Sequence, residues 1–483
     1  MMNKKYAAHF SLGSILTLLL AVESFAVPNI VFLLIDDMGW PDVACYGHSW
    51  HETPNIDRLA ADGMKFTDFY AASPVCSSTR ASIQSGQYSA RVGITDFIPG
   101  HWRPFEKLIV PKIENALPLP IRTPGDILKS AGYQTAYFGK WHLGDGKLHS
   151  PDQRGYDVVD WNMPAGFKQQ RGDAPAGPKK MNVLTDRTIA FIERNKDKPF
   201  FVTLSHHAVH IRVEATPPTI EKYRKKTKPD TGVNHPVYAA MIEDMDTQIG
   251  RIINRIEKLG LSDDTIIVFA SDNGGLRQIY TGVGEIISTN APLRNEKGTV
   301  YEGGIRVPLI VKWPGRIPPA TVCDEPTTTA DLLPTFAEWA HAKLPAGQQL
   351  DGRSLAPLLD MSSDSLNRDA IYFHYPHYHH SRPAGAIRAG KWKLIEWFES
   401  GDVELYDLET DISETTNVAE QHPKLATKLQ AQLAGWRDGA DARMPVINPK
   451  HDPARAHEWW NRRSGKPLDI EAMRRHYDST RNK

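Results

Sequence analysis

Short apolar runs alternate with amphipathic stretches from residue 29 to about residue 359. The apolar runs predict buried strands at residues 30–35, 134–138, 200–204, 265–270 and 307–311. Between the third and fourth runs, isoleucine and methionine recur at helical spacing and predict a long helix over residues 237–259. Strands that alternate with helices are typical of a parallel sheet covered by helices. The pattern therefore predicts an α/β fold with a large, mostly parallel sheet sandwiched by helices, across residues 27–365.

The pattern changes after residue 365. Short β-like segments predict four strands, at residues 370–373, 385–388, 392–397 and 403–408. A helix is predicted to follow them over residues 423–436. Residues 366–440 are therefore expected to form a smaller C-terminal antiparallel α+β subdomain. Residues 441–483 are polar and charged, which predicts an irregular tail.

The first 26 residues have the features of a signal peptide. Lys4 and Lys5 give a basic start, residues 12–22 are apolar, and a small-x-small exit ends at Ala26. The apolar run is short for a membrane span, although an uncleaved anchor is the alternative. We expect a secreted or periplasmic protein with no membrane segment after the signal is cleaved.

Charge and cysteine content narrow the possible functions. Lysine plus arginine and aspartate plus glutamate both number 57, which argues against binding to nucleic acid or to an acidic membrane. An anionic substrate would therefore have to be bound by a few lysine or arginine side chains located at the site itself. The three cysteines are an odd number for an exported protein. If Cys76 is consumed chemically, Cys45 and Cys323 remain, and they could either pair or stay free.

Polar residues follow two of the predicted strands. Asp36 and Asp37 end the first strand, and Asp272 and Asn273 end another. Ligands of open α/β sheets bind beyond the carboxyl ends of the strands. A set of oxygen ligands with no soft ligand suits calcium or magnesium better than zinc. The alternative for each pair is an ordinary turn.

Two further segments carry candidate chemistry. Lys140 can hold an anion and His142 can move a proton near neutral pH, although a surface lysine is the simpler interpretation of this pair. Cys76 and Arg80 precede a helix-like stretch at residues 81–85. Cys76 could be a buried structural cysteine or a thiolate nucleophile with a lowered pKa.

Taken together and in order, these motifs resemble those of the formylglycine-dependent (type I) sulfatases, which have an alkaline-phosphatase-like fold. The resemblance covers nearly all of the chain after residue 26. The motifs that carry it are residues 29–37 with Gly39, Cys76-x-x-x-Arg80 with Gly86, residues 139–144, residues 271–275, residues 297–308 and residues 405–408. Each motif alone is weak evidence for this family, whereas the presence of all of them in this order is specific to it.

The resemblance implies a cofactor and a set of roles. A formylglycine-generating maturation enzyme would oxidise Cys76 to 3-oxoalanine (formylglycine), whose hydrate is the nucleophile. The implied Ca²⁺ ligands are Asp36, Asp37, Asp272, Asn273 and the modified residue 76. Arg80 would stabilise the hydrate, Lys140 and Lys297 would hold the sulfate oxygens, His142 would act as base, and His210 would serve the leaving group.

The sequence departs from the family pattern at two points. The usual modification signal is Cys-x-Pro-x-Arg, and here Ser78 replaces the proline. The family often has His-Thr-Pro near the leaving group, whereas here Ile211 and Arg212 follow His210, with His206 and His207 as alternative histidines. We expect conversion of Cys76 because the rest of the site is intact.

A run rich in histidine, tyrosine and arginine at residues 374–382 opens the small subdomain. It favours a carbohydrate subsite over a transition-metal site, because it contains no cysteine or acidic partner. The predicted substrate-binding residues are His101, Arg103, His377, His379 and Arg382. The expected substrate is a sulfated polysaccharide, with galactose sulfate or N-acetylgalactosamine sulfate favoured.

Two alternatives remain from the sequence. One is a phosphodiester or phosphonate monoester hydrolase on the same fold, sometimes with the same formylglycine. The other is a sulfoglycan-binding protein, which would result if Ser78 prevented conversion of Cys76.

Overall fold

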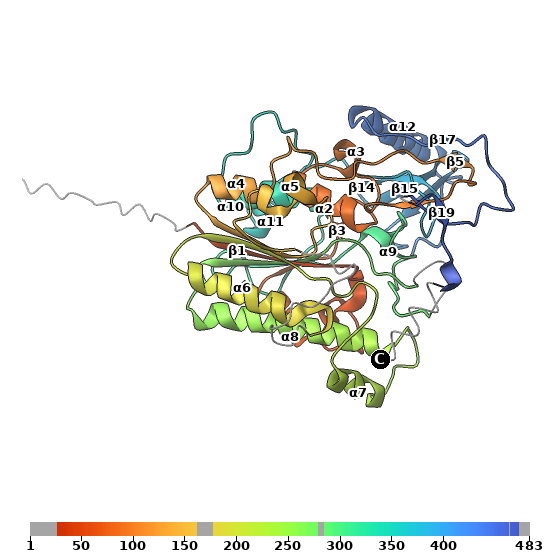
Figure 1. The fold of residues 1–483 in the computed structure, drawn as a ribbon. Helices are drawn as coiled ribbons and strands as arrows, with labels where there is room; N and C mark the ends of the chain where they lie inside the picture. The colour runs from red at the N-terminus through yellow and green to blue at the C-terminus, as the bar shows by residue number, and fades with distance from the viewer. Residues whose placement is uncertain (1–26, 162–176, 279–284, 463, 473–483) are drawn as a thin grey trace, which may run out of the picture.

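One eight-stranded sheet forms the centre of the molecule (Figure 1). The computed structural model describes residues 27–161, 177–278, 285–462 and 464–472, so the predicted signal peptide lies outside it. The strand order is β11-β2-β10-β9-β1-β8-β6-β7. The strands are β1 (Asn29–Ile35), β2 (Met64–Phe66), β6 (Gln134–Gly139), β7 (Val158–Asp160), β8 (Phe200–Ser205), β9 (Thr265–Ser271), β10 (Leu309–Lys312) and β11 (Thr321–Cys323).

Most of these strands run parallel, as predicted. β1 pairs in parallel with both β8 and β9, and β8 pairs in parallel with β6. The exception is β10, which runs antiparallel to β9 and to β2, so the sheet is mixed. The sequence predicts that this strand begins at Val307, but its hydrogen-bonded pairing begins at Leu309, because Pro308 has no N–H to donate.

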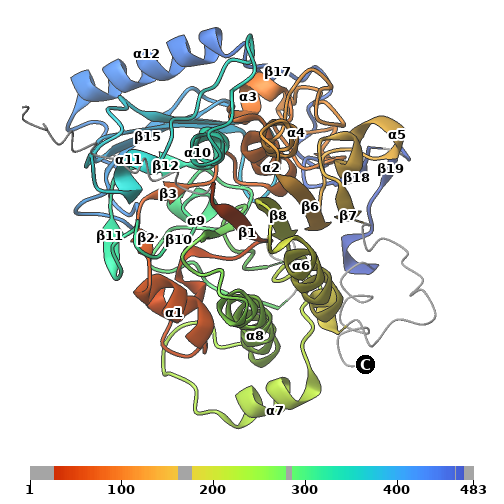
Figure 2. The same ribbon diagram turned by 90° about the vertical axis from the view of Figure 1, so that its left-hand side faces the viewer.

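Helices cover both faces of this sheet (Figure 2). Ile30, Phe32 and Leu34 of β1 belong to one buried core, and the alternate residues of β1 belong to the other. The first core includes α4 (Pro124–Ser130) and α10 (Leu332–Trp339), and the second includes α1 (Pro54–Ala61), α6 (Met181–Asn195) and α8 (Pro236–Lys258). Because β1 is buried on both faces, its sequence is apolar at every position after Asn29. Helix α8 is the long helix that the sequence predicts.

The small subdomain has the predicted antiparallel sheet and helix. Its strands are β13 (Ile371–Tyr375), β14 (Ala384–Ala389), β15 (Trp392–Trp397) and β16 (Val403–Asp407), and its helix is α12 (Pro423–Gly439). One face of this sheet packs on the large domain, and the other face packs on α12. The two domains therefore share a continuous apolar contact.

Shorter elements complete the described chain. They are β3 (Phe69–Tyr70) paired with β12 (Thr327–Thr328), α2 (Cys76–Ser85), α3 (Ser89–Val92), α5 (Gly146–His149), α7 (Pro217–Lys225), α9 (Glu302–Ile305) and α11 (Ala356–Leu359). Within the described ranges, no helix combines the length and the apolarity that crossing a membrane requires.

The C-terminal tail is more ordered than the sequence predicts. β17 (Val446–Ile447) pairs with β5 (Leu108–Ile109), and β18 (Trp460–Asn461) pairs with both β4 (His101–Trp102) and β19 (Lys466–Pro467). The tail is held by backbone pairing to the loop around residues 101–109. The prediction of a wholly irregular tail is therefore wrong in this respect.

A buried cluster of charges joins the small sheet to the large domain. Lys393 Nζ on β15 lies 2.8 Å from Glu302 of α9 and 2.7 Å from Glu414, and the three side chains are fully buried. Glu302 also contacts Arg306, at 3.3 Å. Removing one partner of such a pair leaves an uncompensated charge in a dry environment.

We expect Lys393→Met to destabilise the protein by about 3–5 kcal/mol, because Glu414 would stay buried without its cation and Glu302 would keep only Arg306. Urea unfolding measures this loss. Lys391→Met is the matched control, since Lys391 pairs with Asp407 at the surface and such pairs contribute roughly 0–1 kcal/mol. Equal losses in the two variants would contradict the role given to burial.

Candidate active site

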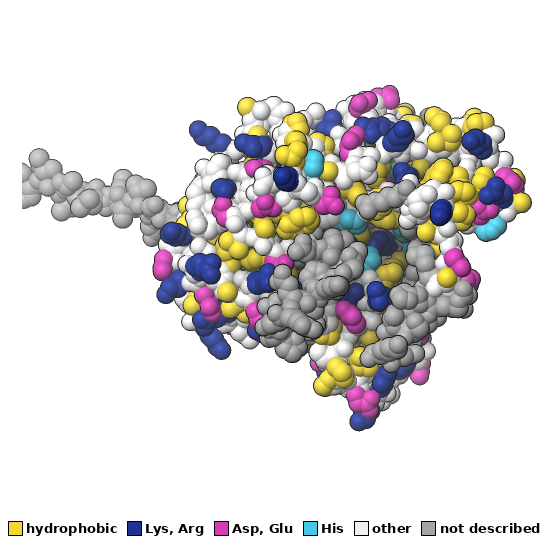
Figure 3. All heavy atoms as spheres, in the orientation of Figure 1, with side chains coloured by type: hydrophobic (Ala, Val, Ile, Leu, Met, Phe, Trp, Pro, Cys, Tyr) yellow, Lys and Arg dark blue, Asp and Glu magenta, His cyan; other side chains and the backbone are white. Residues whose placement is uncertain are grey.

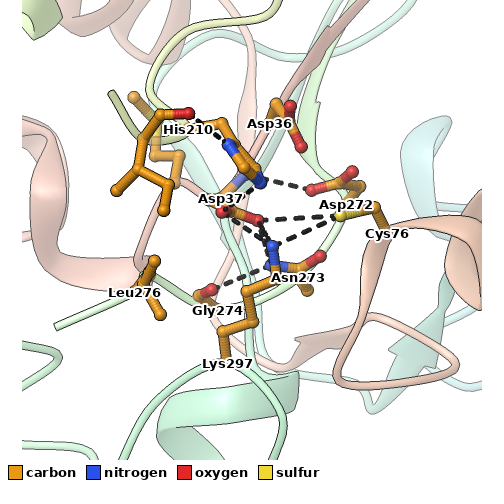
Figure 4. A network of polar contacts seen from close by, with 12 residues as sticks. Asp36, Asp37, Cys76, His210, Asp272, Asn273, Gly274, Leu276 and Lys297 are labelled. Carbon is orange, nitrogen blue, oxygen red and sulfur yellow. Dashed lines mark hydrogen bonds and ion pairs between the residues drawn. The ribbon is translucent and has the colours of Figure 1, made fainter. Parts of the chain in front are cut away.

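The polar residues predicted at strand ends meet at one edge of the sheet (Figure 4). β1 leads into Asp36 and Asp37, and β9 leads into Asp272 and Asn273. β6, which runs parallel to β8, leads into Lys140. Because these strands are parallel, their carboxyl ends lie side by side and bring residues far apart in sequence into contact.

The oxygen-bearing side chains form a compact acidic centre. One ligand atom each from Asp36, Cys76 and Asp272 lies within 4.8 Å of the others, as do atoms from Asp37, Cys76 and His210. Asn273 Nδ2 donates to Asp37 Oδ1 at 2.8 Å, while the buried Oδ1 of Asn273 has no hydrogen-bonding partner among the described residues. A buried oxygen without a partner beside three carboxylates fits a hard cation such as Ca²⁺.

Three buried cations surround the carboxylates. Lys140 Nζ lies 2.7 and 2.8 Å from the two carboxylate oxygens of Asp36, and Lys297 Nζ lies at the same distances from those of Asp37. Burial raises the pKa of Asp36, but the positive charges of Lys140, Arg80 and Lys297 outweigh it and hold that pKa well below its ordinary value. The carboxylates of Asp36 and Asp37 therefore stay ionised at neutral pH, whereas burial raises the pKa of Asp272 to about 6.

Arg80 connects helix α2 to three strand ends. Its Nε donates to Asp272 Oδ2 at 2.9 Å, and its Nη1 donates to the carbonyl oxygen of Lys140 at 2.6 Å and to Ser205 Oγ at 2.5 Å. The close approach of the ends of β6 and β8 depends on Gly139, which has φ 99°. A Cβ added at this residue would lie 1.9 Å from the carbonyl oxygen of Ser205. Arg80 is fixed by these contacts and by its burial.

Cys76 lies at the first residue of α2, at the centre of these charges. Its Sγ is 3.4 Å from Lys297 Nζ and 3.9 Å from Asp37 Oδ1, and only 2% of the residue is exposed. Burial raises the pKa of the thiol to about 11, against the opposing effect of Lys140 and Lys297. At neutral pH the thiol is therefore protonated, which disfavours the thiolate alternative.

Two of the predicted catalytic histidines reach this centre. His142 Nε2 lies 2.7 Å from the carbonyl oxygen of Ile98, and its buried Nδ1 has no partner within the described chain. His210 Nε2 lies 3.5 Å from Asp37 Oδ2. Burial lowers the pKa of His210 to about 4 against the opposing charge of Asp37, and burial together with the charge of Lys140 lowers the pKa of His142 well below its ordinary value. Both rings are neutral at pH 7 in the absence of substrate.

The predicted substrate-binding residues differ in their surroundings. His377 is 1% exposed and contacts Thr95 Oγ1 at 2.8 Å through Nε2, so it has no access to a sugar in this conformation. Arg103 pairs with Glu106 at 2.7 Å and lies over the ring of Trp459. Arg382 lies over the ring of Trp397. The side chain of His101 lies outside the described residues.

His379 is the predicted sugar ligand that lies nearest the charged centre. A Cβ added at Gly298, next to Lys297, would lie 2.1 Å from His379 Nδ1. Its neighbour His380 was not singled out by the sequence, yet its Nδ1 lies 2.7 Å from the carbonyl oxygen of Lys297. The only sign of this contact in the sequence is that His380 shares the histidine-rich run at residues 374–382 with His379.

The remaining cysteines do not form a disulfide. Cys45 and Cys323 are both free thiols, half-buried in different parts of the large domain. The sequence left open whether these two cysteines pair, and in the structure they do not.

Comparison with known proteins identifies the family. The sulfatase family profile matches residues 28–342, and the profile of the N-sulphoglucosamine sulphohydrolase C-terminal region matches residues 295–438. A sulfatase of Formosa agariphila is 32% identical, over 85% of this chain and 88% of its own. The N-acetylgalactosamine-6-sulfatase of Canis lupus familiaris is 29% identical, over 82% of this chain and 78% of its own.

A solved structure supports the same assignment. The structure of Ps i-CgsB in complex with k-i-k-neocarrahexaose has a TM-score of 0.73 and 27% sequence identity to this chain. The match covers 89% of this chain and 96% of the other. The α/β sheet and its small antiparallel subdomain thus have their counterpart in a known enzyme class: the chain belongs to the sulfatase family and is a sulfuric ester hydrolase.

Proposed function

We propose that this sulfatase removes sulfate monoesters from a sulfated polysaccharide, with a formylglycine made from Cys76 and with Ca²⁺ as cofactors. The observation that carries the proposal is the convergence of Lys140, Lys297 and Arg80 on a buried cysteine beside three carboxylates. Galactose sulfate or N-acetylgalactosamine sulfate is the favoured unit. The canine relative is named for an N-acetylgalactosamine sulfate, and the related Ps i-CgsB structure contains a neocarrahexaose.

The donor set supports a calcium site at Asp36, Asp37, Asp272 and Asn273. These residues offer only oxygen atoms, and the free Oδ1 of Asn273 gains a partner when a cation binds. Bound calcium supplies positive charge that polarises the sulfate and offsets the repulsion of an anionic nucleophile.

Formylglycine would provide a route for releasing the bound sulfate, which the thiol of Cys76 lacks. Its hydrate would supply one hydroxyl for attack on sulfur and a second hydroxyl whose deprotonation would release the sulfate. We assign that deprotonation to His142, because its Nδ1 has no hydrogen-bonding partner among the described residues and its lowered pKa keeps the ring neutral. Burial of the whole centre keeps bulk water from competing.

The other cations and His210 complete the reaction. Lys140, Lys297 and Arg80 provide fixed positive charge for the sulfate oxygens, and such preorganised charge is usually the largest catalytic contribution. His210 is neutral before substrate binds. The negative charge of a bound sulfate ester stabilises the protonated imidazole, which can then donate its proton to the departing sugar oxygen.

Conversion of Cys76 also requires a maturation enzyme and export, and both are part of the proposal. Residues 1–26 would direct the chain to the periplasm or the exterior. Ser78 occupies the place of the usual proline in the modification signal. It lies in the first turn of α2, where backbone N–H groups have no partner within the helix, so either residue can be accommodated.

Peptide mass spectrometry across Cys76 tests this proposal directly. In protein from a modification-competent host we expect an aldehyde in place of the thiol, and Ser78→Pro should increase the aldehyde fraction. The same samples are assayed on an aryl sulfate and on a matched aryl phosphate diester. An unmodified thiol in fully active protein would contradict the mechanism, and preferred hydrolysis of the diester would favour the phosphodiesterase alternative. Glycan binding without turnover would favour the sulfoglycan-binding alternative.

A further inference from the structure

A cavity of about 670 Å³ opens on His142. Its wall includes Ile98, whose carbonyl oxygen lies 2.7 Å from His142 Nε2. The N–H of Ile98 donates to the hydroxyl of Ser77 at 3.0 Å, and Ser77 directly follows Cys76. The inner end of the cavity therefore borders the residues that hold the nucleophile. Its volume is within the range of about 300–1,000 Å³ typical of ligand pockets.

The rest of the cavity wall has the chemistry of a site for a charged sugar. Two cations line it, Lys112 and Arg462, together with the side chains of Asn115 and Trp161. An indole offers a flat apolar surface to a sugar ring, and an amide can hydrogen-bond to hydroxyl groups. Among the described residues of the wall, the one carboxylate is that of Asp145, which is exposed to solvent and is suited to accept hydrogen bonds from hydroxyls. The surface view shows histidine and cationic side chains gathered in a recess of this face (Figure 3).

The C-terminal tail brings Arg462 to this cavity. Strand β18 pairs with β4, and the ring of Trp460 lies 5.8 Å from that of Trp102 and 5.9 Å from that of Phe105. These contacts place Arg462 against the loop that precedes β4, where its Nε would lie 3.5 Å from a Cβ added at Gly100. That loop also contains Ile98, so the tail and the catalytic centre share one segment of chain.

We propose that this cavity is a subsite for a second anionic group of the glycan, with Arg462 and Lys112 as the residues that select for it. This inference rests on the proposed function and narrows its substrate class. The favoured substrate carries a further sulfate or carboxylate on the sugar chain beyond the ester that is cleaved. Guanidinium and ammonium groups suit such anions, and the guanidinium can bind them in a bidentate manner.

Arg462→Gln and Lys112→Gln test the subsite, with Lys450→Gln as the matched control. Lys450 is an exposed residue of the same tail outside the cavity wall. The substrates are p-nitrophenyl sulfate and oligosaccharides with one sulfate, with two sulfates, or with one sulfate and one uronate. For each cavity variant we expect kcat/KM on the doubly charged oligosaccharides to fall ~10-fold or more beyond any change on p-nitrophenyl sulfate, mainly through KM. The two doubly charged substrates distinguish a sulfate from a carboxylate as the preferred group.

Equal losses on all substrates, or no loss in either cavity variant, would overturn the subsite. Lys112 is exposed, so Lys112→Gln keeps the test valid if Arg462→Gln disturbs the tail. Failure of the proposed function gives a different result, since the unaltered enzyme would then leave every sulfate ester intact. Calorimetric binding of the disulfated oligosaccharide to a Cys76→Ala protein, with and without Arg462→Gln, measures the subsite independently of turnover.

Discussion

Cys76→Ala is expected to lower kcat on an aryl sulfate by at least ~10⁴-fold, because it removes the nucleophile while leaving the surrounding charges in place. The Sγ of Cys76 makes only a weak contact with Asp37 and one with Lys297, so its loss should leave the fold intact. Activity assays at saturating substrate, with thermal unfolding of the same sample, separate the loss of chemistry from a loss of stability.

Two further variants sharpen this result. Cys76→Ser offers a hydroxyl that can accept the sulfuryl group but has no second hydroxyl to expel it. It should therefore release at most one equivalent of alcohol and retain one SO₃ group, which mass spectrometry detects. Cys45→Ala is the control, since Cys45 is a half-buried free thiol packed outside the charged centre. Full activity in Cys76→Ala would rule out the proposed nucleophile.

Removal of calcium is expected to lower kcat/KM by ~10³-fold or more, reversibly on adding Ca²⁺ back. The carboxylates of Asp36 and Asp37 would then neutralise Lys140 and Lys297 through their direct ion pairs, instead of leaving that charge for the sulfate. Chelator titration of the aryl sulfatase activity measures the loss. A rise in Tm with added Ca²⁺ provides a second readout that does not require turnover.

Asn273→Ala identifies the site of this effect. The substitution removes the Oδ1 that has no hydrogen-bonding partner and two donor contacts, to Asp37 and to the Gly274 carbonyl oxygen. We expect it to raise the Ca²⁺ concentration needed for half-maximal activity by about 10-fold or more, and Asn273→Asp to restore much of the affinity. Asn417→Ala, at an exposed position of the small subdomain, is the control. A calcium response that is the same in all three variants would place the ion elsewhere.

The strand ends explain why much of the charged centre could be predicted. β1 and β9 are buried on both faces, so each contains a continuous apolar run, residues 30–35 directly before Asp36 and residues 266–270 shortly before Asp272. The rule that parallel strands present their carboxyl ends at one edge then places these carboxylates together. The direction of β10 does not follow from such a pattern, because parallel and antiparallel buried strands are apolar in the same way.

Other features depend on contacts that no local pattern reveals. Glu302, Lys393 and Glu414 are charged residues distant in sequence, and only the docking of the two domains buries them together. Arg462 lies in a polar tail, and its place in the cavity depends on the pairing of a two-residue strand.

The burial of Cys76 has a consequence for the order of events during biosynthesis. Lys297, which closes the pocket over its Sγ, is separated from it by 221 positions in the chain, so the pocket forms only after most of the large domain has been made and folded. The maturation enzyme of the proposed function would need access to a thiol that the folded protein leaves only 2% exposed. Oxidation of Cys76 and completion of the fold would then compete in time, and the yield of active enzyme would depend on which of the two is faster.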